Sequence, residues 1–326
     1  MGCSKTDNNS ENEVLDNDVA VEVESEKSLD EESEDNNDDA ETVEYIKVTD
    51  SLDRELIFEK KPEKVVAIGS SLVDLWQLAG GEIVGTTTDS FSKEMGFDED
   101  VVVNLGALHE PNVEEVFKLE PDLVILSPLI SAQAELATVL EKADINVYNA
   151  DMNSFEVYLE ILKDFTDLTG HSEMYTKNGE DLQKVVEDVK AEASASFDNK
   201  DVLMIRANTT GTKAIPVDNF AVKIVEDMGL NNISDDDSAI LSNLSIESII
   251  AKDPYYIFYV VMGRDDAKSR AELDTYILQN PAWETLTAVQ EGRFIELPKE
   301  LFHNKPNARW GEAYEYVFDI RKAQEQ

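Results

Sequence analysis

Few side chains in this 326-residue chain have the types and spacing that chemistry needs. They are three histidines, one cysteine, and two glutamates at matching places. Protein sites for bare zinc or a similar metal bring together three or four ligands such as histidine and carboxylate. His109 lies in the first half of the chain, His171 near its middle and His303 close to its end. Because three such distant histidines are not expected to converge, we predict no free metal ion as the ligand.

Motifs for covalent chemistry are missing from the sequence. There is no Gly-rich phosphate loop, no G-x-S-x-G motif, and no cysteine beyond Cys3. A single cysteine also excludes an internal disulfide and a cysteine-based zinc site. We therefore predict a protein that is not an enzyme and has no intrinsic cofactor. An enzyme built on two α/β lobes and a surface interaction module are the alternatives.

The two glutamates, Glu114 and Glu247, belong to a stretch that the chain contains twice, at 112–125 and 245–258. Each copy opens on a side chain that can cap a helix, followed by an apolar residue, the glutamate, a helical run and a proline. The cap and the proline are Asn112 and Pro121 in one copy, and Ser245 and Pro254 in the other. An apolar run follows each proline, as in a parallel strand buried on both faces. The glutamate is thus predicted in the first turn of each helix.

Strands and helices alternate along the chain before and after a long polar helix. Strands are expected within 45–50, 54–58, 61–68, 82–85, 122–126, 145–148, 201–206, 255–261 and 293–297, and helices at 72–78, 131–143, 154–196 with a break near 168–171, 221–228 and from 310. Such alternation indicates parallel sheets flanked by helices. We predict that Asn112 and Glu115 form a reciprocal capping box, and that Ser70 or Ser71 caps the helix at 72–78.

The long helix divides the body into two parts. Its second half is charged, with a sparse apolar stripe, which favours a strut between domains over a core element. The fold class is therefore α/β, with two Rossmann-like lobes joined by a single interdomain helix. The predicted domains are a disordered acidic tether at 1–42, an N-terminal lobe at 43–168, the helix at 169–196 and a C-terminal lobe at 197–326.

The composition excludes some classes of function. The net charge of −42 argues against nucleic-acid binding, which needs clustered Lys and Arg. No apolar run reaches the roughly 18 residues that span a bilayer. The first residues instead suggest a lipid anchor. Cys3 fits the lipidated cysteine of a bacterial lipoprotein, Gly2 fits a myristoylation motif, and an accidental cysteine is the plain alternative.

The chain resembles the substrate-binding proteins of bacterial ABC importers, in the class with a rigid interdomain helix that captures ferric siderophores, haem or cobalamin. The resemblance covers about residues 45 to 323. It rests on the order and spacing of the segments at 61–67, 106–125, 281–283 and 289–294, the lone helix between the lobes, and the closing helix from Trp310.

The resemblance implies that Glu114 and Glu247 dock into arginine pockets of a two-fold permease dimer, since a pseudo-symmetric protein must present like charges at corresponding places. It implies a ligand held between the lobes, by loops at the carboxyl ends of the strands. The candidate ligand-binding residues are Ser70, Phe91, His109, Ser127, Arg206, Met262, Arg264, His303 and Arg309.

Among these residues, Arg206 is the expected partner of a carboxylate or catecholate oxygen, and His303 is a possible haem ligand. His171 is expected to be structural. The implied protein is a monomer, anchored through lipid on Cys3 to the extracytoplasmic face of a bacterial membrane, and it delivers its ligand to the permease.

Overall fold

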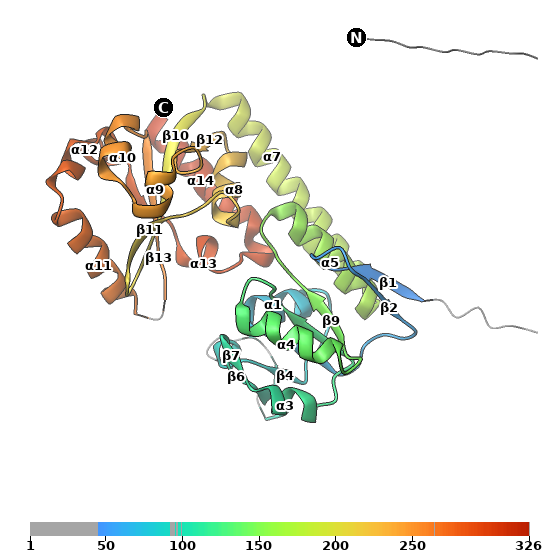
Figure 1. The fold of residues 1–326 in the computed structure, drawn as a ribbon. Coiled ribbons are helices and arrows are strands. Elements are labelled where there is room, and N and C mark those ends of the chain that lie inside the picture. Colours follow the sequence, from blue (N-terminus) through green and yellow to red (C-terminus); the bar gives the residue numbers. More distant parts are fainter. Residues whose placement is uncertain (1–44, 92–94, 96, 99, 264, 326) are drawn as a thin grey trace, which may run out of the picture. The chain divides into compact units, whose positions relative to one another are not determined.

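One parallel sheet and one mostly parallel sheet organise the chain. The computed structural model describes residues 45–91, 95, 97–98, 100–263 and 265–325. The tether predicted at 1–42, with Gly2 and Cys3, lies outside these residues, as does Arg264. Figure 1 shows the two sheets with their helices, so the predicted two-lobed α/β fold is confirmed.

The first sheet has the strand order β5-β4-β3-β8-β9, and all its pairs are parallel. Its strands are β3 (Val65–Ala67), β4 (Gly85–Thr86), β5 (Val103–Asn104), β8 (Leu123–Leu126) and β9 (Asn146–Asn149). The helices of this half are α1 (Ser70–Leu78), α2 (Thr88–Phe91), α3 (Val113–Lys118), α4 (Ser131–Glu141) and α5 (Phe155–Thr169). All four residues of β8 are buried, as expected of a central parallel strand.

Two antiparallel hairpins accompany the first sheet. The strands expected within 45–50 and 54–58 are confirmed as β1 (Ile46–Thr49) and β2 (Glu55–Phe58), which pair with each other. The short hairpin of β6 (Gly106–Ala107) and β7 (Glu110–Pro111) was not predicted. The strand expected at 82–85 begins only at Gly85, and the segment from Thr86 to Asn104, where no element was expected, contains α2 and β5. Strands of two residues leave no periodic pattern that a sequence can reveal.

The second sheet has the order β11-β10-β13-β14, and β12 pairs with β10. Its strands are β10 (Lys200–Asn208), β11 (Gly211–Ala214), β12 (Leu230–Asn232), β13 (Tyr256–Val261) and β14 (Phe294–Glu296). Only β11 runs antiparallel to its neighbour. The helical segments around this sheet are α8 (Phe220–Asp227), α9 (Ser238–Asn243), α10 (Ile246–Lys252), α11 (Asp266–Leu278), η2 (Pro281–Thr285), α12 (Thr287–Gln290), α13 (Lys299–Phe302), η3 (Asn307–Arg309) and α14 (Trp310–Glu325).

Between α5 and β10 the backbone is helical almost throughout. The break predicted near 168–171 is present, because Gly170 ends α5 in the left-handed conformation, with φ of 73°. Helix then continues through α6 (Ser172–Tyr175), the π-helical η1 (Thr176–Glu180) and α7 (Asp181–Ser196). A Cβ atom at Gly311 would lie 3.0 Å from Val185 Cγ1, so glycine lets α7 approach α14 closely. The domain boundaries at 168 and 196 stay a prediction.

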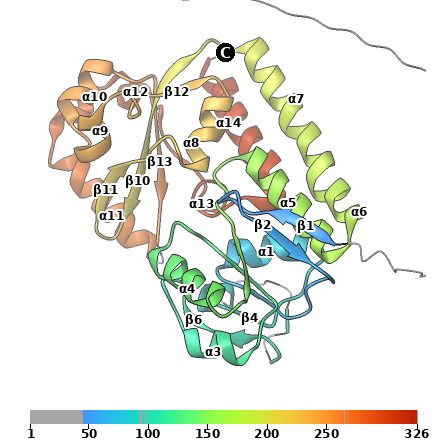
Figure 2. The ribbon, with the colours of Figure 1, turned by 45° about the vertical axis from the view of Figure 1, so that its right-hand side comes forward.

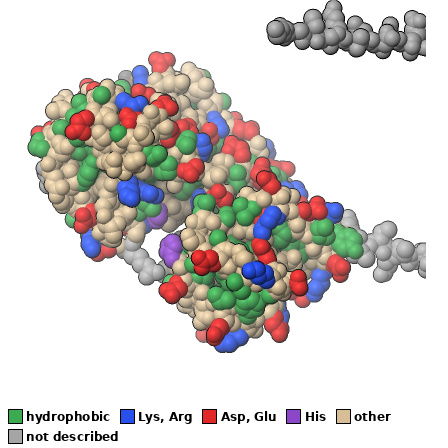
Figure 3. Space-filling view, viewed as in Figure 1, with side chains coloured by type: hydrophobic (Ala, Val, Ile, Leu, Met, Phe, Trp, Pro, Cys, Tyr) green, Lys and Arg blue, Asp and Glu red, His purple; other side chains and the backbone are tan. Residues whose placement is uncertain are grey.

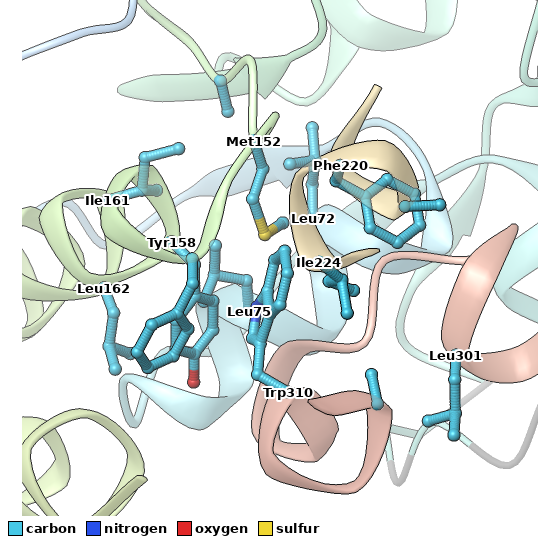
Figure 4. Close-up of a cluster of buried hydrophobic side chains, with 14 of the residues drawn as sticks. Leu72, Leu75, Met152, Tyr158, Ile161, Leu162, Phe220, Ile224, Leu301 and Trp310 are labelled. Carbon is cyan, nitrogen blue, oxygen red and sulfur yellow. The ribbon is translucent and has the colours of Figure 1, made fainter. Parts of the chain in front are cut away.

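One hydrophobic core includes residues from both halves of the fold. It contains Leu75, Met152 and Tyr158 from the first half, and Phe220 and Trp310 from the second. Figure 4 shows the indole of Trp310 among these side chains. The Trp310 ring centroid lies 5.6 Å from that of Phe155 and 5.9 Å from that of Phe220. The two halves are therefore joined by packing as well as by helix.

Candidate functional site

The two matching glutamates lie exposed in the first turns of α3 and α10. The Asn112 side chain accepts hydrogen bonds from the backbone N–H groups of Glu114 and Glu115, and Ser245 Oγ accepts one from Ser248. In both copies the residue before the proline has a positive φ, 48° at Glu120 and 39° at Asp253. The helix–proline–strand unit therefore repeats in three dimensions, as predicted from the sequence.

The reciprocal half of the predicted capping box is wrong. Glu115 Oε1 accepts from Lys118 Nζ at 2.5 Å, one turn ahead. The backbone N–H of Asn112 donates to the carbonyl of Leu105 instead. Because that N–H already has a partner in the neighbouring chain segment, the Glu115 carboxylate is left to pair with the lysine.

Three candidate residues of the first half follow strands of one parallel sheet. Ser70 follows β3, Phe91 ends the short helix after β4, and Ser127 follows β8. Because the carboxyl ends of parallel strands meet at one edge, the fold brings these three segments to the same edge. Phe91 is half-buried. It packs on the core, with its ring 5.3 Å from that of Phe97.

Gln133 links this edge to His109 and was missed by the sequence reading. It is fully buried in α4; its Oε1 accepts from the backbone N–H of Ser127, and its Nε2 donates to the carbonyl of Leu108. Leu108 and His109 form the turn between β6 and β7. The exposed His109 is thereby held beside the segment that carries Ser127.

The side chain of Asp89 occupies the N-terminus of helix α1. Gly69 takes the N-cap position, with φ of 105°, so the prediction that Ser70 or Ser71 caps this helix is wrong. Ser70 is its first residue, and its backbone N–H donates to Asp89 Oδ2 at 2.8 Å. The other carboxylate oxygen of Asp89 accepts from Thr87 Oγ1 at 2.7 Å. A carboxylate here uses the positive end of the helix, which could otherwise bind a ligand anion.

In the second half, Arg206 and Met262 lie at the carboxyl ends of neighbouring parallel strands. Arg206 pairs in register with Val260, and the N–H of Met262 donates to the carbonyl of Ala207. His303, half-buried, follows α13. Arg309 is exposed at the end of η3, where its guanidinium donates to Glu312 at 2.8 and 3.0 Å. The fold therefore brings Arg206 and Met262 together, whereas Arg309 already has an acidic partner.

Lys213 is a second missed residue. It lies directly opposite Arg206 in the antiparallel pair of β10 and β11. Residues opposite each other in such a pair project from the same face, with Cβ atoms about 5 Å apart. In the described part of the chain, neither cation has an ion pair or a hydrogen bond, whereas every other described arginine is ion-paired.

The segment before α14 holds the two halves together through polar contacts. Asn307 Nδ2 donates to the carbonyl of Ser71 at 2.9 Å and to Asp74 Oδ2 at 2.6 Å. Lys305 Nζ donates to the carbonyl of Met152 and lies 4.6 Å from the ring centroid of Phe220. Burial lowers the pKa of Lys305 to about 8, which the nearby carboxylate of Asp151 partly opposes.

Neither of two cavities in the described residues contains a candidate ligand residue. One, of about 340 Å³, lies between the end of α7, the start of β10 and Glu325. The other, of about 580 Å³, lies between β1, the turn after it, α5 and Tyr175. Figure 3 shows a hollow elsewhere, with histidine side chains on both of its sides and Lys or Arg side chains close by.

Neither a metal site nor a membrane-spanning helix is present among the described residues. There, no three or more His, Cys, Asp or Glu side chains are grouped so that they could hold a metal ion. The helices of the same residues include none with the length and apolar character required to cross a bilayer. His171, expected to be structural, is exposed at the start of α6, and its Nδ1 lies 3.1 Å from Glu173 Oε1.

Comparison with known proteins shows which proteins share this fold. The chain is 22% identical over 247 residues to the ferric-anguibactin-binding protein FatB of Vibrio anguillarum, covering 73% of this chain and 76% of that protein. Among solved structures, S. aureus IsdE complexed with heme matches with a TM-score of 0.67 and 19% identity, covering 79% of this chain and 98% of that one.

The periplasmic vitamin B12 binding protein BtuF of Vibrio cholerae matches with a TM-score of 0.66 and 19% identity, over 82% of this chain and 99% of that chain. Likeness at this level of identity shows a shared fold. The model of the family described as "Periplasmic binding protein" matches residues 65–301, more than two thirds of the sequence. That family consists of binding proteins, so the enzyme alternative no longer applies, and the chain belongs to the periplasmic binding protein family.

Proposed function

We propose that this protein captures a metal chelate or tetrapyrrole-like ligand between its two halves and delivers it to an ABC importer. The proposed ligand is a ferric siderophore, haem or cobalamin. One observation supports the proposal that the protein delivers its ligand to a two-fold partner. The repeated unit presents the exposed Glu114 and Glu247 at corresponding places on the two halves. Arginine side chains on two permease subunits would bind these carboxylates bidentately.

Ligand capture would use the edges at which the strands of both sheets end. The first half would contribute Ser70, His109 and Ser127, and the second half Arg206, Met262 and His303. A histidine on either side of the hollow suits a ligand that carries iron, because imidazole binds iron well. Phe91, Arg264 and Arg309 remain candidate ligand residues.

Movement of the two halves should be small during capture. The shared core around Trp310 and the bonds of Asn307 would have to break if the halves separated widely. Burial of many apolar side chains makes such a rearrangement costly. We therefore propose a mechanism of slight closure, limited by helix α7 and by this junction.

The protein would act as a monomer at the extracytoplasmic face of a bacterial membrane, held there by lipid on Cys3 and the acidic segment that follows. Mass spectrometry of the membrane-extracted protein should find a diacylglyceryl group on Cys3. Myristate on Gly2 would contradict the bacterial lipoprotein assignment.

Titration of the intrinsic fluorescence tests ligand capture directly. The three tryptophans, of which Trp76 and Trp310 lie in the core that joins the two halves, provide the signal. Haemin, cyanocobalamin, ferric citrate and ferric catecholate siderophores are added in turn to the apo-protein. Saturable quenching by at least one compound is expected, and no change with any of them would contradict the proposed function.

A further inference from the structure

An unneutralised pair of cations marks one side of the proposed ligand site. Arg206 and Lys213 face each other across β10 and β11, and like charges directly opposite in a sheet are destabilising. The chain has 70 acidic residues against 28 basic ones, so acidic partners are abundant. Two adjacent cations without such a partner therefore form a preorganised place for an anion from outside the protein.

The pair lies at the correct end and on the correct face of the second sheet for this role. Met204, two residues before Arg206, and Ile215, two after Lys213, belong to the core shared with the first half. Because side chains alternate between the faces of a strand, Arg206 and Lys213 project from that same face, beyond the core. Figure 2 shows β10, β11 and β13 extending toward the half that contains α4 and β6.

The first half of the fold, on the opposite side of the site, is poor in cations. Between residues 65 and 117 the sequence contains one Lys and no Arg, and that lysine, Lys93, is outside the described residues. The N-terminus of α1 holds the Asp89 carboxylate, and the hydroxyls of Thr86 and Ser90 lie 2.9 Å apart nearby. These two hydroxyls are fully buried and bond each other, so this side offers a ligand the half-buried Asp89 carboxylate and no described lysine or arginine. It therefore disfavours a second anionic group.

We propose that the site is electrostatically polarised and takes an anionic, oxygen-rich chelate in one orientation. This rests on the proposed function and specifies its ligand. The carboxylate or catecholate oxygens of the ligand bind Arg206 and Lys213, and its uncharged, hydrogen-bonding end lies against the first half, near Asp89. A corrin whose periphery bears uncharged amides makes poor use of the two cations.

Removing a cation and removing the carboxylate are expected to have opposite effects on ligand binding, and such variants test the polarised site. Arg206→Met and Lys213→Met retain much of the apolar stem and should each weaken binding of the anionic chelate about tenfold or more, since hydrogen bonds to charged groups are worth about 1.5–3 kcal/mol. Asp89→Asn keeps an oxygen that accepts from Ser70 but removes the charge, so it should tighten binding severalfold. Lys268→Met, at an exposed lysine of α11, is the matched control and should change nothing.

The measurement is fluorescence titration of the full chain with ferric citrate, haemin and cyanocobalamin, at low and at high NaCl concentration, with circular dichroism to confirm folding. Salt should weaken binding to the wild type more than to Arg206→Met. If the wild type binds cyanocobalamin most tightly, or if both Met variants bind an anionic chelate as the wild type does, the polarised site is wrong while the proposed function stands. If the wild type binds none of the three compounds or any ferric siderophore, both are wrong.

Discussion

The side-chain amide of Asn307 donates to the carboxylate of Asp74 at 2.6 Å, and so joins the segment before α14 to helix α1. The same amide also donates to the carbonyl of Ser71. Asn307 is fully buried and adopts φ of 50°, a conformation that asparagine and glycine tolerate better than other residues. These two bonds are the clearest polar link between the two halves of the fold.

Asn307→Gly should destabilise the protein by about 1–3 kcal/mol, because the half-buried Ser71 carbonyl and Asp74 carboxylate lose their donor while the backbone stays relaxed. Asn307→Ala should cost roughly 1 kcal/mol more, since alanine is strained at positive φ. Urea denaturation monitored by circular dichroism measures both. Equal stability of the two variants would show that strain plays no part, and a loss below about 0.5 kcal/mol for Asn307→Gly would show that the link is not stabilising.

Trp310→Ala should cost about 3–5 kcal/mol, as large-to-small changes in a tight core do. Trp310→Phe should cost clearly less. The indole Nε1 is buried and has no hydrogen-bond partner in the described residues, so phenylalanine removes an unsatisfied donor along with some apolar area. Thermal unfolding of the two variants compares them, and a loss as large for Phe as for Ala would mean that the indole nitrogen does bond in solution.

Mild acid should stabilise the protein through Asp164. Burial raises the pKa of this carboxyl from 3.8 to about 6, although the hydroxyl of Tyr148 donates to it at 2.7 Å. The folded state therefore binds more protons than the unfolded state between about pH 4 and 6, and stability falls as the pH rises through this range. Asp164→Asn keeps an acceptor for Tyr148 and removes the charge.

The variant should therefore melt at a higher temperature than the wild type at pH 7.5, and the difference should shrink as the pH falls to 5. Calorimetry at both pH values gives the comparison, with the exposed Asp144→Asn as control. A constant difference at the two pH values would mean that Asp164 does not titrate in this range.

Much of the fold follows from local signals in the sequence. Asn112 and Ser245 cap their helices, and the strands after Pro121 and Pro254 form as predicted, because caps and prolines act within a few residues. The start of α1, in contrast, could not be predicted from local signals. Asp89 reaches Ser70 from 19 positions away, and nothing near Ser70 in the sequence signals that contact.

The pairing of Arg206 with Lys213 could be predicted from the sequence only in part. Asn208 and Gly211 flank a two-residue turn, and such a turn fixes the register of the hairpin. The residues at 208–211 have the composition of a turn, but no strand was expected after them, because Gly211-Thr-Lys-Ala214 has too little apolar character to indicate one. Extending the turn to a hairpin would have placed the two cations opposite each other.

Uptake by a reconstituted importer is the most direct test of the account. The variant Glu114→Ala/Glu247→Ala and the wild type are compared in vesicles that contain the cognate permease, using the chelate that quenches wild-type fluorescence. Ligand affinity should stay within about twofold, while uptake should fall at least about a hundredfold, since losing one partner of a buried interfacial charge pair costs about 2–5 kcal/mol. The control Glu135→Ala/Glu284→Ala removes two other exposed carboxylates and should transport normally. Normal uptake by the Glu114/Glu247 variant would contradict the docking role of the repeated unit.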